Sequence, residues 1–219
     1  MEAFSQLDTW QLVAIAAALG FASGLRLYAV LFVVGAAGYL GWVELPSGLA
    51  VLSHPLVLAA SGFMCFVEFF ADKIPGVDSL WDIVHTLLRV PAGAALAASV
   101  FGDSSAAAML AAAILGGTLA AGTHAAKTGS RLLINASPEP VSNWIASLSE
   151  EALVFGGLYA AFQHPTLFLV LLAVFMVLLG WLLPKLWHAL RSVLRRLSGF
   201  RARRIRDGAK KYRGEFIDP

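Results

Sequence analysis

Residues 10–42 read WQLVAIAAALGFASGLRLYAVLFVVGAAGYLGW and contain a single charged side chain, Arg26. A helix of this length would measure about 50 Å, whereas the hydrocarbon core of a bilayer is about 30 Å thick. The stretch is therefore apolar enough to enter a membrane but too long to cross it as one upright helix. Gly20 and Gly24 precede Arg26 near its midpoint. We expect a strongly tilted helix, or one broken there into a re-entrant pair of half-helices.

The rest of the chain has the same membrane character. Of its 219 residues, 58% are hydrophobic and 14% are charged, whereas soluble domains are about 25% charged. Six stretches are long enough to span a bilayer, namely residues 10–42, 55–73, 79–101, 105–133, 140–162 and 165–187. The predicted fold class is all-α, a polytopic transmembrane bundle of about six helices over residues 1–184.

The fourth stretch resembles the first in being long and rich in glycine. Gly129-Ser130-Arg131-Leu132 repeats the pattern of Gly24-Leu25-Arg26-Leu27. This short match is what an inverted repeat of three plus three helices would place in both halves, with the first and fourth helices broken or re-entrant.

Residues 185–219 form a separate basic tail. They carry eleven Lys or Arg, whereas residues 1–184 carry five. The positive-inside rule makes the tail cytoplasmic, and six crossings would place the N-terminus there too. Its amphipathic spacing suits a helix bound to anionic lipid headgroups. No Lys or Arg occurs before Gln11, so no secretory signal peptide is predicted, and the basic charge is no reason to propose nucleic-acid binding.

Polar residues form helical stripes inside four of the apolar stretches. Ionisable residues at membrane depth are costly, so they face a partner or a water-filled cavity. Asp78 and Lys73 lie close to helix ends and are interpreted as a cap and an interfacial charge. The candidate site for a substrate or an ion consists of Arg26, Glu68, Asp72, Asp82, His85, Arg89, His124, Lys127, Arg131, Asn143 and Glu150.

The stripes leave several chemistries open. Carboxylates beside His85 and His124 could relay protons, and the basic side chains could bind a phosphate or carboxylate headgroup. Asp78, Asp82 and His85 could ligate a divalent metal with Glu68, but their spacing matches no metal motif. No nucleophile–base pair is evident. We therefore expect no catalytic residues, metal or cofactor, and a lipid-modifying enzyme is the minor alternative.

The run EFFADKIPGVDSLWD at residues 68–82, continued by His85-Thr86 and Arg89, resembles a bacterial family of small multi-pass membrane proteins, the domain of unknown function 4126 family. Ser23-Gly24-Leu25-Arg26 and residues 137–143 share the resemblance, which covers roughly residues 8–184. It implies a prokaryotic inner-membrane protein, but it brings no activity, ligand or catalytic residues.

Two functions follow from these observations. Broken helices combined with intramembrane charge predict a small transporter or channel-like protein of the inner membrane, with a polar site for an ion, small anion or lipid headgroup. The alternative is a non-transporting scaffold or assembly factor whose charges form structural ion pairs. The small-residue stretch 106–113 could serve close helix packing or a homodimer contact.

Overall fold

The computed structural model describes residues 7–74, 76–135, 140–185, 187–188 and 191, and within them every regular element is a helix. In chain order these are α1 (Thr9–Tyr39), the short 3₁₀-helix η1 (Ser47–Ser53), α2 (Pro55–Ala71), α3 (Val77–Val100), α4 (Ala106–Ile134), α5 (Pro140–Gln163) and the unlabelled Pro165–Lys185 helix. Five of them are long and apolar enough to span a membrane, and η1 with α2 forms a bent pair that could be a sixth span. The predicted all-α bundle is confirmed.

α1 is a hairpin of two half-helices that turns back at Arg26. The backbone of Arg26 is not helical, with φ −147° and ψ 85°. Before the turn, Gly20 and Gly24 approach Gly116 and Thr123 of α4. After it, the chain runs along α2 and returns to η1, so that both ends of α1 line one cavity. α1 therefore enters and leaves at the same end of the bundle.

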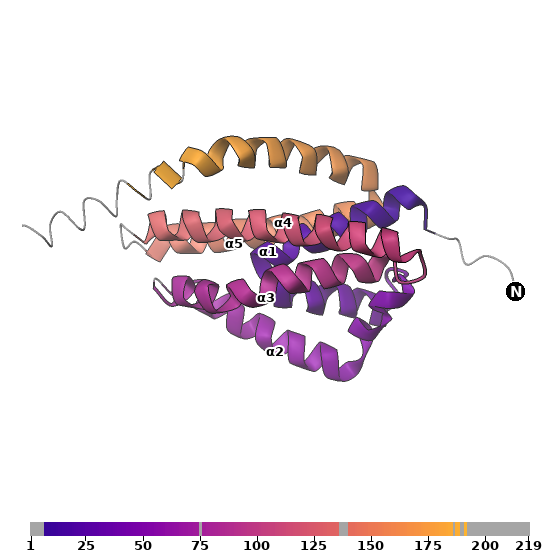
Figure 1. Ribbon diagram of the computed structural model, residues 1–219. Coiled ribbons are helices and arrows are strands. Elements are labelled where there is room, and N and C mark those ends of the chain that lie inside the picture. Colours follow the sequence, from indigo (N-terminus) through magenta and orange to yellow (C-terminus); the bar gives the residue numbers. More distant parts are fainter. Residues whose placement is uncertain (1–6, 75, 136–139, 186, 189–190, 192–219) are drawn as a thin grey trace, which may run out of the picture.

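The hairpin occupies the centre of the bundle. Its most apolar window is 78% buried, compared with 17% for the Pro165–Lys185 helix, and it contacts all of the labelled elements. Figure 1 shows the remaining helices running back and forth around it, between the end where α1 begins (at Thr9) and the end where the last helix, drawn in orange, finishes (at Lys185). We call these the Thr9 end and the Lys185 end.

Small residues allow α1, α3 and α4 to pack closely. A Cβ on Gly116 would lie 2.6 Å from the carbonyl oxygen of Gly93 and would also meet the Cβ of Ala97. A Cβ on Gly20 would in turn meet the backbone of Gly116. Since apolar burial contributes little to helix association within lipid, this close backbone contact is a main source of packing energy.

The structure differs from the sequence-based topology in two respects. α4 is one continuous helix through Gly129, so the expected break in the fourth helix is wrong, because glycines alone do not interrupt a helix that its neighbours support. The start of α1 and the end of the Pro165–Lys185 helix lie at opposite ends of the bundle (Figure 1), whereas six full crossings would place them at the same end. The difference arises because α1 turns back instead of crossing.

Replacing Gly116 by alanine should destabilise the protein by about 1–3 kcal/mol, because the added methyl group overpacks the contact with Gly93 and Ala97. Thermal denaturation in detergent measures the effect. Gly156→Ala is the matched control, since no atom lies within 4 Å of its added Cβ. Equal stability of the two variants would contradict the close packing of α3 and α4.

Candidate functional site

Polar and charged side chains from α1 to α5 meet beside the turn of α1. We define the buried charge network as eleven ionisable residues, five basic and six acidic. They are Arg26, Lys73, Arg89, Lys127, Arg131, Glu68, Asp72, Asp78, Asp82, Glu150 and Glu151. The five bases are all of the Lys and Arg residues that precede Lys185 in the sequence.

Arg89 of α3 joins two acids from different helices. Its Nη2 donates to Oε1 of Glu68 on α2 at 2.8 Å, and its Nη1 donates to Oδ1 of Asp82 at 2.8 Å. All three side chains are fully buried. Nη1 also lies 3.3 Å from Nδ1 of His124, whose Nε2 contacts the hydroxyl group of Thr86 at 2.7 Å.

Lys127 of α4 lies at the centre of the network. Its Nζ donates to Oδ2 of Asp72 at 2.7 Å and lies 3.3 Å from Glu150 and 3.5 Å from Asp82. It also donates to the carbonyl oxygen of Leu25 at 3.0 Å. Because the helix is interrupted at the next residue, this carbonyl needs a donor from outside the helix. Lys127 is that donor, and it thereby links the turn of α1 to the buried charge network.

Arg26 connects the turn of α1 to α2 and α5. Its Nη2 lies 3.1 Å from Asp72 and 3.4 Å from Glu151, and it donates to the hydroxyl group of Ser147 at 2.6 Å. Lys73 reaches the same Ser147 and Glu151, at 3.2 and 3.3 Å. Lys73, which the sequence predicted to be an interfacial charge, therefore lies at the edge of the network.

Arg131 closes the network toward the Lys185 end. Its Nε and Nη2 both donate to Oε1 of Glu150, at 3.1 and 3.0 Å. Its Nη1 donates to the side-chain and backbone oxygens of Asn143 and to the backbone oxygen of Asp72. A guanidinium group held by five bonds has little freedom to move, so this part of the network is rigid.

Ten of the eleven predicted site residues take part in this constellation or hydrogen-bond to it, and His85 lies at its margin. The His85 ring stacks on Trp81, contacts Tyr28 edge-on and forms a hydrogen bond with the Trp81 carbonyl. It makes no ion pair among the described residues.

The sequence-based site omitted several polar partners. Asp78 lies in the first turn of α3, whose N-cap is Gly76, so the prediction that Asp78 is the cap is wrong. Its side chain accepts from the amides of Gly76 and Ser79 and from Asn135, and it belongs to the network. Asn135 also accepts from the amide group of Asn143. Asn135 gave no usable signal, because an asparagine at a helix end is equally typical of an ordinary cap.

Four carboxylate oxygens in the network have no hydrogen-bond donor among the described residues. They are Glu68 Oε2, Asp72 Oδ1, Asp82 Oδ2 and Glu150 Oε2. Nε of Arg26 and of Arg89 also lack an acceptor. Such atoms are costly in a low-dielectric interior, so the pairing within the network is incomplete on both sides. In the described part of the chain, no cluster of three or more His, Cys, Asp or Glu has the geometry of a metal site.

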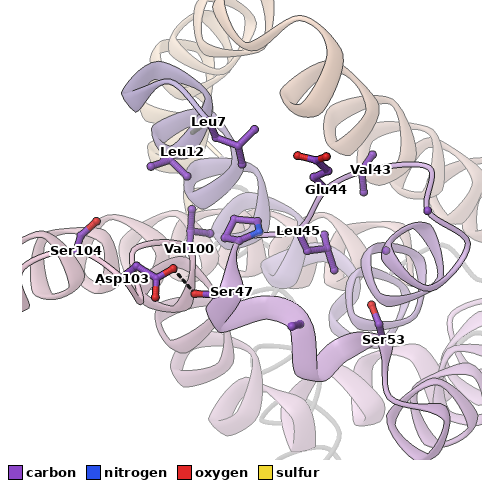
Figure 2. A pocket seen from close by; sticks show the side chains of 14 residues that line it. Leu7, Leu12, Val43, Glu44, Leu45, Ser47, Ser53, Val100, Asp103 and Ser104 are labelled. Atoms are coloured by element: carbon purple, nitrogen blue, oxygen red, sulfur yellow. Dashed lines mark hydrogen bonds between the residues drawn. The ribbon is translucent and has the colours of Figure 1, made fainter. Parts of the chain in front are cut away.

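A cavity of about 1010 Å³ opens at the Thr9 end, between the two legs of the α1 hairpin. Figure 2 shows Leu7 and Leu12 on one side, Glu44 and Leu45 on the opposite side, and Ser47 below them, hydrogen-bonded to Asp103. The fourteen residues that line it include two acids and no Lys or Arg. Its rim therefore carries negative charge, which favours cations over anions.

The apolar helices and the central charges define a multi-pass membrane protein built around a re-entrant hairpin. The sequence profile of the family described as domain of unknown function (DUF4126) matches residues 13–185. The chain belongs to this family, as the resemblance of residues 68–89 implied. No curated protein and no solved structure matches it. The predicted basic tail from residue 185 onward lies almost entirely outside the described residues.

Replacing Arg89 by methionine should destabilise the protein by about 3–5 kcal/mol, because it leaves Glu68 and Asp82 as buried charges without their shared partner. The free energy of unfolding in detergent is the quantity to measure. Arg191→Met, at an exposed position, serves as the control and should change it by less than about 0.5 kcal/mol. Similar values for both variants would show that the Arg89 pairs contribute no stability.

Proposed function

We propose that the protein is a small transporter of the bacterial inner membrane, with the buried charge network as its ion- or substrate-handling centre. The single observation that supports this most is the position of Arg26, a buried charge at the non-helical turn of a re-entrant hairpin. Transporters commonly bind their substrates where broken helices meet near the middle of the bilayer. The proposal assigns the network no catalytic step.

The cost of the arrangement supports this proposal. Buried ion pairs are often no more stabilising than apolar residues of the same volume, and an interrupted helix within a membrane exposes backbone groups that need new partners. The buried ion pairs and the interrupted backbone occur together at the turn of α1, where Lys127 bonds to the Leu25 carbonyl and Arg26 contacts Asp72. Ionisable groups retained at such a cost in membrane proteins are commonly functional.

The hairpin also offers a route from the cavity to the network. Leu12 and Gly38 line the cavity, and Arg26 lies at the far end of the two legs. Between these levels the legs carry the buried apolar side chains Ile15, Leu19, Val30 and Val34. These side chains separate the cavity from the network. A continuous path between the two would therefore form only if the legs of the hairpin moved apart or tilted.

The charge distribution supports one orientation of the bundle. Lys185 and the basic residues that follow it favour the cytoplasm for the Lys185 end. The Thr9 end carries Asp8, Glu44 and Asp103, and its described residues include no Lys or Arg. In this orientation the cavity faces outward, and Thr9 lies on the outer side, in contrast to the cytoplasmic N-terminus expected from six crossings.

A non-transporting scaffold is the second candidate. The observation that favours it is the dense pairing of the network, in which Arg131 alone makes five hydrogen bonds. Static ion pairs of this kind could fix the packing of α2 to α5 around the hairpin without any movement. The two candidates differ in whether water ever reaches the residues between the cavity and Arg26.

The proposed orientation predicts labelling from the outer side at both Asp8 and Asp103. Single cysteines at these positions, in a Cys65→Ser background, should react with a membrane-impermeant thiol reagent added to spheroplasts. A cysteine at Val141, exposed near the Lys185 end, should react only after lysis. If the cysteine at position 8 required lysis while the one at position 103 did not, the first helix would cross the membrane and the hairpin would be contradicted; if both required lysis, the proposed orientation would be reversed.

Transport predicts transient water access between the legs of the hairpin. Cysteines replacing Ile15 and Val34, both nearly fully buried, should react slowly with an impermeant reagent from the Thr9 end. A cysteine at Leu87, which is 81% exposed on the outer face of α3 and faces lipid in this arrangement, should not react. If the two buried positions were as inert as Leu87, the scaffold would be the better account.

A further inference from the structure

Glu68 is the acid with the fewest partners at the heart of the network. Its side chain is fully buried, and among the described residues it accepts one hydrogen bond, from Arg89 to Oε1. Oε2 has no donor. Arg89 is moreover shared with Asp82 at the same distance of 2.8 Å, so the one cation in direct contact with Glu68 among the described residues is divided between two acids.

The other acids of the network are better compensated. Asp72 has both Lys127 and Arg26 within 3.1 Å. Asp78 accepts from two backbone amides and from Asn135. Asp82 lies near Lys127 as well as Arg89, and Glu150 accepts twice from Arg131.

The charge count of the network points in the same direction. Six carboxylates face five cations, so with all of them ionised one negative charge remains in excess. An uncompensated charge in a low-dielectric interior is strongly unfavourable. Binding one proton would neutralise the excess negative charge. Because a proton adds to an existing oxygen atom, it needs no cavity to hold it.

Each element packed around Glu68 contributes charged or titratable groups. α1 places Arg26 and Tyr28 near it. α3 supplies its partner Arg89, with Asp82 and His85 beside Arg89, and α4 places Lys127 near Glu68 and His124 beside Arg89. Cys65 and Asp72 are its titratable neighbours on α2. Glu150 and Glu151 of α5 reach Arg26, and Glu150 also reaches Lys127.

We propose that the network binds one proton at Oε2 of Glu68, which would make a proton the coupling ion of the proposed transporter. The coupling role rests on the proposed transport function, whereas proton binding at Glu68 does not. A proton taken from water forms an O–H bond at Oε2 and leaves the carboxyl group neutral. Oε1 continues to accept from Arg89, and release returns the proton to water.

The proton has a route to solvent at the edge of the network. Glu150 and Glu151 keep 10% and 17% of their side-chain surface exposed. From Glu151, contacts of 3.5 Å or less run through Arg26, Asp72, Lys127, Asp82 and Arg89 to Glu68. Small shifts along this chain would admit the water molecules that carry the proton, while the apolar residues between the hairpin legs keep the other side closed.

Infrared spectroscopy of the full chain in lipid nanodiscs tests the binding directly. At neutral pH the wild type should show the carbonyl stretch of a protonated carboxylic acid, shifted by deuterium exchange and lost on alkaline titration. Glu68→Gln should lose this band, and Glu68→Asp should retain one with a different titration midpoint. Asp8→Asn, which removes an exposed carboxylate, should leave the band unchanged.

The absence of the band from the wild type, or its persistence in Glu68→Gln, would overturn the assignment. Proteoliposomes with an internal pH-sensitive dye then separate the two proposals. Proton uptake that falls to the level of protein-free vesicles in Glu68→Gln supports both. The infrared band without any proton uptake supports the binding site and counts against transport, whereas uptake that is unchanged in Glu68→Gln supports transport and overturns the role of Glu68.

Discussion

The need to keep five positive charges away from lipid governs this structure. Every Lys and Arg before Lys185 lies in one cluster with six carboxylates, and most of these side chains are fully buried. Because an unpaired charge at membrane depth costs several kcal/mol or more, no helix that contributes to the cluster can rotate or slide without exposing part of it. The network therefore fixes the rotation of α2, α3, α4 and α5 about their axes and their heights relative to the turn of α1.

The hairpin and the network depend on each other. A helix interrupted within a membrane is tolerated only where its free backbone groups find partners inside the protein, and Lys127 supplies one by bonding to the Leu25 carbonyl. Arg26 in turn needs carboxylates, which Asp72 and Glu151 supply from two other helices. The glycine contacts between α1, α3 and α4 bring the backbones close enough for these short side-chain bonds to form. The result is a charged centre nearer the Lys185 end and an open cavity at the Thr9 end, whose lining includes Glu44 and Asp103.

The sequence predicted the helices and their polar faces well, because both depend on local patterns. The expected stretches agree with the observed helices to within a few residues, although the first is interrupted at Arg26. The stripe Asp82, His85 and Arg89 faces inward as its spacing requires. The pairing of charges between helices could not be predicted. A polar stripe shows which side of a helix faces inward, but not how far along the bundle axis each residue lies relative to those of the other helices. Arg89 could have met Glu150 as readily as Glu68. The return of α1 at Arg26 was one of two alternatives, and the equally glycine-rich α4 remained straight, because the distinction depends on what each helix packs against.

The central claim is that the turn of α1 is held by charge pairing with its neighbours, and a double-mutant cycle between Arg26 and Asp72 tests it most directly. The free energy of unfolding would be measured for Arg26→Met, Asp72→Asn and the double variant in one lipid or detergent system. Direct pairing at 3.1 Å predicts strong non-additivity, with a coupling energy of about 1–3 kcal/mol. Effects that add to within about 0.5 kcal/mol would mean that the two residues do not interact, and the account of the hairpin would fail.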